Sequence, residues 1–415
     1  MKDKTIQFFR LIYRLKDKIA FYPSLIGFLG CLVAYLMFYL EKLGVSKHLL
    51  EFIPELAINN TDTARALLTT FIAGLISIMV FSFSMVMILL SQASSNFSPR
   101  LLPGLISNTR HQIVLGLYLA TIIYCIFILV SIEPNSNKYQ LPAFSILFAI
   151  LFMLNCLAAF IYFIHSISQE IQISNIMEKI FNTSKKRLEV LIENDDTRTF
   201  DDTSNWKVYT SNVCGYLQNV SIKDIAEIAD KVNAKIEITP VKGSFILVKD
   251  DLFKASEALN EEQVDSILRH FEFTKSEMIE DNYVLAFKQL TEIALKAMSP
   301  GVNDPGTAIN AIDYLTQLFV IRAKKNDVTY CLVNNEIKVS MSTVNFKLLL
   351  FQVMAALRTY CKHDIILVQK LLAMLYNVKK NCKNNTYTEA LSKEIEELKK
   401  DAKSTIKNNR DLSFL

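Results

Sequence analysis

The sequence lacks the residue patterns that mark most enzymes and metal proteins. Its 415 residues include only 5 histidines, 10 glycines and 1 tryptophan, and the 7 cysteines contain no C-x-x-C pair. No G-x-x-x-x-G-K-[ST] phosphate loop, G-x-S-x-G nucleophile elbow, E-x-x-H pair or H-x-x-x-H pair occurs. We therefore expect no catalytic site, metal site, disulfide framework or bound cofactor, and we do not expect an enzyme.

The charge distribution also gives no sign of a nucleic-acid partner. Residues 1–165 contain 12 basic and 7 acidic side chains, whereas residues 166–415 contain 33 and 34. The net charge of +4 therefore belongs to the first part of the chain. Because the second part has no basic stripe, zinc-finger spacing or helix-turn-helix signal, we expect no nucleic-acid binding.

What the sequence does contain is a set of four long, uncharged apolar runs. They cover residues 19–40, 66–90, 112–132 and 141–164, and none follows. At about 1.5 Å per residue, each run is long enough to cross a hydrocarbon layer of roughly 30 Å as a helix. We predict an α-helical membrane protein with a four-helix transmembrane domain in residues 1–165, and the lipid bilayer as its first partner.

The charges beside these runs predict the orientation of the chain. Six lysines and arginines precede the first run, against two aspartates, and the link after the second run carries Arg100 and Arg110 without an acid. The positive-inside rule then places both termini in the cytoplasm. The first run is longer than the apolar region of a signal peptide and no small-residue cleavage site follows it, so we expect it to be retained.

The rest of the chain predicts a cytoplasmic α+β domain that is mostly helical. Apolar residues at helical spacing continue the fourth membrane helix into a stalk and linker over residues 166–204. A small α/β module is expected at 205–250 and a mainly helical domain at 251–415. In the latter, Asp304 and Pro305 suit the N-cap and first position of a helix, and Asn334–Asn335 favour a hairpin turn.

Hydroxyl side chains recur at seven-residue intervals along the second apolar run. Thr70, Ser77 and Ser84 belong to a series that extends from residue 63 to residue 98 and follows one slowly drifting helix face. The series indicates either close packing between helices or a wall that replaces part of the hydration of an ion or small solute. Asn155, in the fourth run, is either an interhelical hydrogen-bonding residue or a fourth pathway-lining candidate.

A polar segment follows at the expected cytoplasmic end of this stripe. Ser91, Gln92 and Asn96 precede Pro99 and Arg100. Polar side chains can satisfy the backbone groups that are freed where a proline ends a helix, and a cation suits the membrane interface. The segment is either an ordinary exit of a membrane helix or a cytoplasmic gate formed by Ser91, Gln92, Asn96 and Arg100.

A second dense segment lies at residues 297–308. Pro300, Gly301, Asn303, Asp304 and Pro305 lie in this stretch, whose two prolines and two glycines leave little backbone freedom. The first N–H groups of the helix that begins here would suit an anion, but Asp304 itself occupies that position. The segment is either a rigid structural corner between two helices or a regulatory loop that contacts a ligand or another subunit.

Three stretches resemble a known family. S-Q-A-S-S-N-F-S-P-R-L-L at 91–102, followed by V-L-G-L-Y-L-A-T-I-I-Y-C at 114–125, is similar to a signature of bacterial predicted membrane proteins of the domain-of-unknown-function 2254 family. A-L-K-A-M-S-P-G-V-N-D-P-G-T-A-I at 294–309 and G-Y-L-Q-N-V at 215–220 resemble two further segments. The chain departs from the family at 280–282, where Glu-Asp-Asn replaces an acid-proline or Q-D-P-like turn. The resemblance implies a four-span membrane unit with a cytoplasmic domain.

Four spans are few for a monomeric transporter, which usually contains inverted repeats that this sequence does not show. We therefore predict a homo-oligomer of the bacterial inner membrane, in which the second helices form a pathway for an ion or small solute. The cytoplasmic domain would assemble and regulate it. The alternative is a non-conducting membrane-anchored sensor or scaffold, whose cytoplasmic domain binds a ligand or a partner protein.

Overall fold

The fold is described from a computed structural model. The described residues are 20–46, 58, 60–96, 109–132, 142–170, 172–193, 200–274 and 282–415. The chain divides into two compact units, Met1–Gln172 and Ile173–Leu415. Each unit has a buried apolar core of its own.

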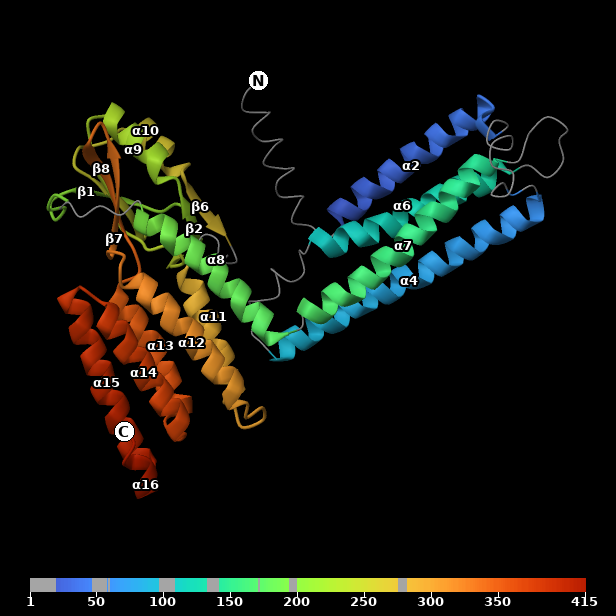
Figure 1. The fold of residues 1–415 in the computed structure, drawn as a ribbon. Helices are drawn as coiled ribbons and strands as arrows, with labels where there is room; N and C mark the ends of the chain where they lie inside the picture. The colour runs from blue at the N-terminus through green and yellow to red at the C-terminus, as the bar shows by residue number, and fades with distance from the viewer. Residues whose placement is uncertain are drawn as a thin grey trace. The chain divides into compact units, whose positions relative to one another are not determined.

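The described residues of the first unit form four long helices, as the sequence predicts. They are α2 (Phe21–Lys42), α4 (Thr61–Asn96), α6 (Thr109–Ser131) and α7 (Ala143–Glu170) (Figure 1). Each includes a stretch that is long and apolar enough to cross a membrane, which confirms the predicted fold class of the unit. The unit extends past the predicted boundary at residue 165, because α7 continues to Glu170.

Helix α6 is the central helix of this unit. Half of its apolar stretch is buried, against 17 to 22% in the other three helices, and it contacts all three. It lies close to α2 at Gly30, where an added Cβ would lie 2.7 Å from the Cα atom of Ala120. Small residues allow such close packing in a membrane, where the hydrophobic effect does not drive helices together.

A carboxylate joins the last turn of α2 to the first turn of α7. Glu41, near the end of α2, accepts hydrogen bonds from the backbone N–H and the hydroxyl of Ser145, both at 2.9 Å. Ser46 donates its hydroxyl to the other oxygen of Glu41 and accepts the N–H of Phe144 at 3.0 Å. These bonds satisfy N–H groups in the first turn of α7, where a negative charge is also favoured by the helix dipole.

The second unit contains two sheets. The strands of the larger sheet lie in the order β1-β5-β3-β8-β7, and those of the smaller in the order β4-β2-β6. All neighbouring strands are antiparallel except β3 and β8, which are parallel with Ile236 opposite Val339. The strands are β1 (Lys207–Thr210), β2 (Gly215–Val220), β3 (Ile236–Ile238), β4 (Phe245–Ile246), β5 (Asp251–Ala255), β6 (Phe271–Thr274), β7 (Val328–Val333) and β8 (Glu336–Ser342).

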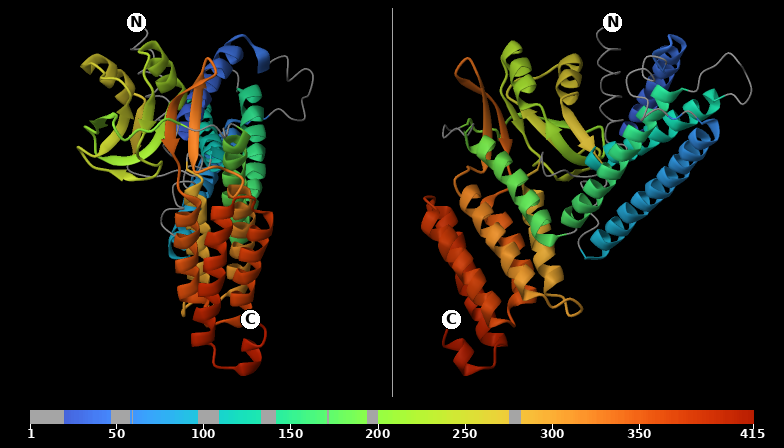
Figure 2. Two further views of the ribbon diagram at one scale, coloured as in Figure 1. Left: turned by 90° about the vertical axis from the view of Figure 1, so that its left-hand side faces the viewer. Right: turned by 45° about the vertical axis from the view of Figure 1, so that its right-hand side comes forward.

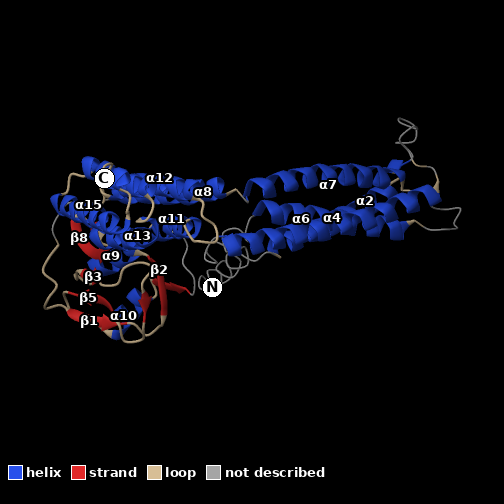
Figure 3. Cartoon of the chain, turned by 90° about the horizontal axis from the view of Figure 1, so that it is seen from below, coloured by secondary structure: helices blue, strands red, loops and turns tan. Residues whose placement is uncertain are grey.

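This topology corrects the predicted division of the second unit. The strands within 205–250 are not a separate module, because β5 lies between β1 and β3, and the hairpin β7–β8 adds two further strands to the same sheet. Helices α9 (Ile222–Lys231) and α10 (Glu261–Leu268) pack with the strands around a common core. In Figure 3 the strands gather on one side of the unit and the longer helices on the other.

The longer helices of the second unit pack against one another (Figure 2). They are α8 (Ile173–Glu193), α11 (Val284–Ala297), α12 (Pro305–Arg322), α13 (Phe346–Cys361), α14 (Ile365–Asn381) and α15 (Asn385–Thr405), followed by the short α16 (Asn409–Leu412). The predicted stalk is not one continuation of the fourth membrane helix. Helix α7 ends at Glu170, and α8 begins at Ile173 and packs on α11 and α12.

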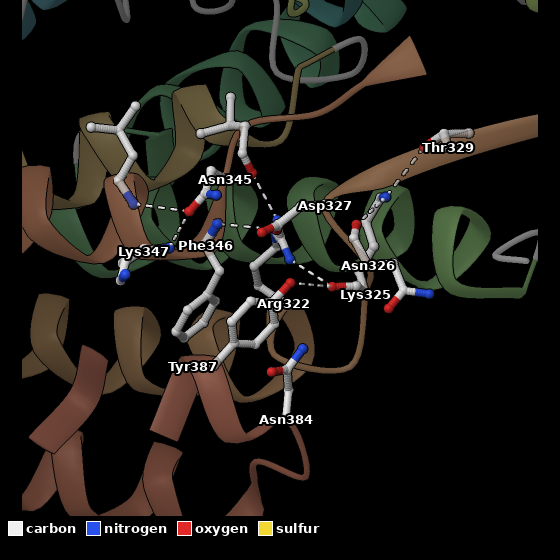
Figure 4. Close-up of polar contacts among 12 residues, drawn as sticks. Arg322, Lys325, Asn326, Asp327, Thr329, Asn345, Phe346, Lys347, Asn384 and Tyr387 are labelled. Atoms are coloured by element: carbon white, nitrogen blue, oxygen red, sulfur yellow. Dashed lines mark hydrogen bonds and ion pairs between the residues drawn. The ribbon is translucent and has the colours of Figure 1, made fainter. Parts of the chain in front are cut away.

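A fully buried arginine connects the helices to the sheet. Arg322, at the end of α12, donates to the hydroxyl of Tyr283 at 2.9 Å, to the carbonyls of Lys325 and Val344 at 2.8 and 2.7 Å, and to the carboxylate of Asp327. Asp327 also accepts the N–H of Phe346, the first residue of α13 (Figure 4). Arg322, together with its partner Asp327, therefore links the last turn of α12 with the first turn of α13, the start of β7 and the residue before α11.

Candidate functional site

The hydroxyl stripe lies on the outward face of α4. Thr70, Ser77 and Ser84 are exposed in the single chain, whereas Leu75 and Ser82 of the same helix are fully buried. Ser77 follows Leu75 by two residues, which is a rotation of about 200° around a helix. The stripe therefore points away from the other helices of its own unit and does not contribute to the packing inside it.

Each of these three hydroxyls bonds to its own helix. Thr70, Ser77 and Ser84 donate to the carbonyls four residues earlier, at 2.7, 2.9 and 2.9 Å. Such a bond satisfies the polar hydrogen and lets the side chain face an apolar medium at little cost, while the hydroxyl oxygen can still accept from or coordinate another partner. The stripe is therefore compatible with lipid, with a second protein surface or with a solute.

Asn155 does not lie in one wall with the stripe. Helix α7 presents Met153 to Gly74 of α4, with 4.0 Å between the Met153 Cε atom and the position of a glycine Cβ. Asn155 follows Met153 by two residues and so points to the opposite side of α7. Its side chain is exposed and donates to the carbonyl of Leu151 at 2.9 Å. The structure brings Asn155 to the depth of Gly74 but not to the face of Ser77.

The predicted gate is described only in part. Ser91 is exposed on α4, and Gln92 and Asn96 belong to the same helix. The side chains of Gln92 and Asn96 lie outside the described part of the structure, as does Arg100. The choice between a helix exit and a gate therefore stays a prediction.

The corner at residues 299–305 has the geometry of a helix cap. The carboxylate of Asp304 accepts the N–H of Thr307 at 3.1 Å and its hydroxyl at 2.6 Å, and Pro305 is the first residue of α12. These hydrogen bonds from Thr307 lower the pKa of Asp304. Asn303 takes a positive φ of 47°, and Pro300, Gly301 and Asn303 are exposed. Both oxygens of Asp304 thus serve the start of α12.

Polar groups inside the membrane unit were missed by the sequence analysis. Ser82 of α4 and Gln112 and Tyr118 of α6 are at most 2% exposed. The side chains of Ser82 and Tyr118 interact with each other, whereas the polar atoms of the Gln112 side chain meet no hydrogen-bond partner within the described residues. A single serine, glutamine or tyrosine in an apolar run gives no signal of the direction in which it points. Elsewhere in the described residues, no three His, Cys, Asp or Glu side chains gather as a metal site would require.

The second unit contains a cavity that no sequence pattern predicts. Its volume is about 70 Å³, and it lies among α8, the first turns of α9 and α11, the turn after β3 and the ends of β7 and β8. The lining residues are Arg187, Leu191, Ile222, Val241, Lys242, Asn282, Tyr283, Val284, Thr329, Met341, Ser342, Thr343 and Val344. They come from six separate segments, so no local motif marks the cavity.

The comparisons with known proteins agree with the four membrane helices. Uncharacterized proteins of Mycobacterium bovis and Mycobacterium tuberculosis are 27% identical to the chain over 341 residues, which is 77% of this chain and 64% of theirs. The chain thus spans less than two thirds of the length of these relatives. No solved structure matches it. Residues 16–377 match the family described as predicted membrane protein (DUF2254), and the chain, with its four membrane helices, belongs to that family.

Proposed function

We propose that the protein is a homo-oligomer of the bacterial inner membrane in which α4 helices of neighbouring copies meet and line a pathway for an ion or small solute. One observation carries this proposal, namely the outward position of Thr70, Ser77 and Ser84 on a membrane helix. An outward face meets either lipid or protein, and a face of small and hydroxylated residues lets another helix approach closely. Its hydroxyls can then replace water around a solute.

The second unit would be the cytoplasmic, regulatory part of this assembly. The proposal places it there because basic residues gather before α2 and between α4 and α6. In that orientation Ser91, Gln92, Asn96 and Arg100 lie at the cytoplasmic end of α4 and form the gate, and the protein carries out no catalysis. The corner at Pro300, Gly301 and Asp304 is then a structural element of the regulatory part.

Reconstitution tests the proposal directly. Purified protein in liposomes is assayed for potassium and chloride flux, and its mass in detergent is measured in parallel. We expect Ser77→Leu or Ser84→Leu to abolish flux while the mass stays that of the oligomer, because leucine removes oxygen ligands and narrows the wall. Ser24→Leu adds the same bulk at an exposed serine of α2, away from both α4 and α7, and serves as the matched control, with flux and mass unchanged.

Two outcomes would count against the pathway. If Ser77→Leu dissociates the oligomer while the remaining complexes conduct normally, the hydroxyl face serves packing only. If the intact wild-type oligomer passes neither ion, the second candidate is favoured, a membrane-anchored sensor or scaffold. The specific observation that supports this second candidate is the cavity of the second unit, which offers room for a ligand without any pathway.

A further inference from the structure

We propose that the cavity of the second unit binds a small organic carboxylate, that is, a carboxylate group on a short apolar body. The site lies entirely within residues 173–415. A carboxylate bound here would be the ligand of the second candidate function, the membrane-anchored sensor. The site does not depend on the proposed pathway, because binding requires neither flux nor an oligomer.

The charge of the lining selects an anion. Arg187 and Lys242 are the basic residues among the described residues of the lining, and none of these described lining residues is Asp or Glu. The Nε atom of Arg187 is buried and meets no hydrogen-bond acceptor among the described residues. A buried guanidinium nitrogen without an acceptor is unfavourable, and a carboxylate is the planar partner that suits its fork of donors.

The hydroxyls of the lining are arranged as donors. Tyr283 accepts a hydrogen bond from Arg322 at 2.9 Å, and Thr329 accepts one from Lys325 at 3.2 Å. A hydroxyl oxygen that accepts from a cation keeps its own proton to donate elsewhere. The buried Thr343 hydroxyl interacts with that of Tyr283, and a pair of hydroxyls bonded to each other leaves one proton to donate to a ligand. Two buried cations behind the lining, Arg322 and Lys325, therefore donate to these hydroxyl oxygens and leave the hydroxyl protons to donate elsewhere; Figure 4 shows the contact between Lys325 and Thr329.

The remaining walls require that the anion carry an apolar part. Six of the lining side chains are apolar, and they are Leu191, Ile222, Val241, Val284, Met341 and Val344. Inorganic phosphate would lose its hydration against these walls without compensation, whereas a short alkyl group gains from leaving water. With a volume of about 70 Å³, the cavity holds only a few water molecules and therefore suits a short chain.

Titration calorimetry of the full-length protein in detergent tests this site, with sodium propionate as the probe. We expect saturable propionate binding, at least tenfold weaker binding by Arg187→Met, and several-fold weaker binding by Thr343→Val, which keeps the shape but removes the donor. Arg187→Lys keeps the positive charge but lacks the forked pair of donors, so its affinity for propionate should lie between those of the wild type and Arg187→Met. Lys186→Met, an exposed change one residue away on α8, is the matched control and should bind as wild type does.

Several results would overturn the assignment. Propionamide has the same size without the charge, so equal binding of propionamide would show that the cavity selects shape only. If inorganic phosphate binds as tightly as propionate, the apolar walls do not select the ligand. If Arg187→Met binds propionate with unchanged affinity, the guanidinium does not hold the carboxylate. No propionate binding at tens of millimolar would reject the proposal outright. Urea unfolding followed by Trp206 fluorescence verifies that each variant is folded, since this only tryptophan lies in the second unit.

Discussion

Replacement of Arg322 by methionine should destabilise the second unit severely. The side chain is fully buried and donates hydrogen bonds to the Tyr283 hydroxyl, to two backbone carbonyls and to the Asp327 carboxylate. Methionine fills a similar volume but leaves Asp327 without its cation and the two carbonyls without a donor. Breaking a buried ion pair from one side costs about 3–5 kcal/mol, so we expect a loss of this size in the free energy of unfolding.

The assay is urea unfolding of the full-length protein in detergent, followed by the fluorescence of Trp206. Because this tryptophan lies in the second unit and no other exists, the signal reports on that unit alone. Arg410→Met, at an exposed arginine of α16, is the control and should change stability by less than about 0.5 kcal/mol.

A double variant separates the ion pair from general damage. Arg322→Met combined with Asp327→Leu removes the unpaired charge, so it should be more stable than the sum of the two single changes predicts. If the two changes add without coupling, or if Arg322→Met alone loses less than about 1 kcal/mol, the buried pair does not hold the unit together and the reasoning is wrong.

Three further predictions concern other parts of the chain. Asp304→Ala should lower the free energy of unfolding by about 0.5–2 kcal/mol, and Asp304→Asn should lower it much less, since asparagine still caps the helix. The hydrogen bonds from Thr307 lower the pKa of Asp304 in the folded state, so the extra stability of the wild type over Asp304→Ala is present above the ordinary pKa of 3.8 and is lost as the pH falls through the folded pKa. Urea titrations at several pH values measure this difference. Gly30→Ala should destabilise the membrane unit by about 1–3 kcal/mol, because the added methyl group meets the backbone of Ala120. Gly74→Ala should be tolerated, because its methyl group meets only the end of the Met153 side chain. The temperature at which the buried Cys125 and Cys156 react with a thiol dye measures the stability of each variant. Thiol labelling from outside intact cells should reach Asn137→Cys and miss Ser107→Cys, and the reverse pattern contradicts the proposed topology.

Local features of the fold could be predicted from the sequence because their causes are local. The hairpin turn at Asn334–Asn335 has both residues at positive φ, 50° and 67°, which asparagine tolerates better than most residues. The cap at Asp304 follows from a side chain that reaches the N–H of the third residue onward. In both cases the residues that determine the structure are neighbours in sequence.

Other features depend on contacts between distant segments. The parallel pairing of β3 with β8 joins Ile236 to Val339, and neither strand shows by itself which partner it takes. The burial of Arg322 is equally hidden, since the sequence shows only an arginine at the end of a helix. The cavity draws its lining from six segments, so only the assembled fold brings Arg187 and Thr343 together.

The direction of the α4 stripe shows a further limit of sequence patterns. Two series on this helix share the same period of seven, the exposed hydroxyls at Thr70, Ser77 and Ser84 and the buried residues at Leu68, Leu75, Ser82 and Leu89. The period shows which residues share a face, but both series satisfy it equally. Only contacts with α6 and α7 decide that the leucines turn inward and the hydroxyls outward.

The positions of Ser77 and Asn155 together restrict the symmetry of the proposed oligomer. Asn155 is exposed at the depth of Gly74, on the side of α7 that faces away from α4, and its one hydrogen bond among the described residues is to the carbonyl of Leu151. Its remaining amide hydrogen and oxygen would be costly in hydrocarbon. A two-fold dimer through α4 would cover the hydroxyl face of each copy and leave Asn155 in lipid. A ring of three or more copies, in which the α4 helices meet around the central axis, also buries the flanks of each copy against its neighbours, and we expect the exposed face of α7 with Asn155 to lie on such a flank. We therefore expect a mass that corresponds to three or more copies. We also expect Asn155→Leu to weaken the assembly, as Ser77→Leu does if the hydroxyl face serves packing only. A dimeric mass would exclude the ring.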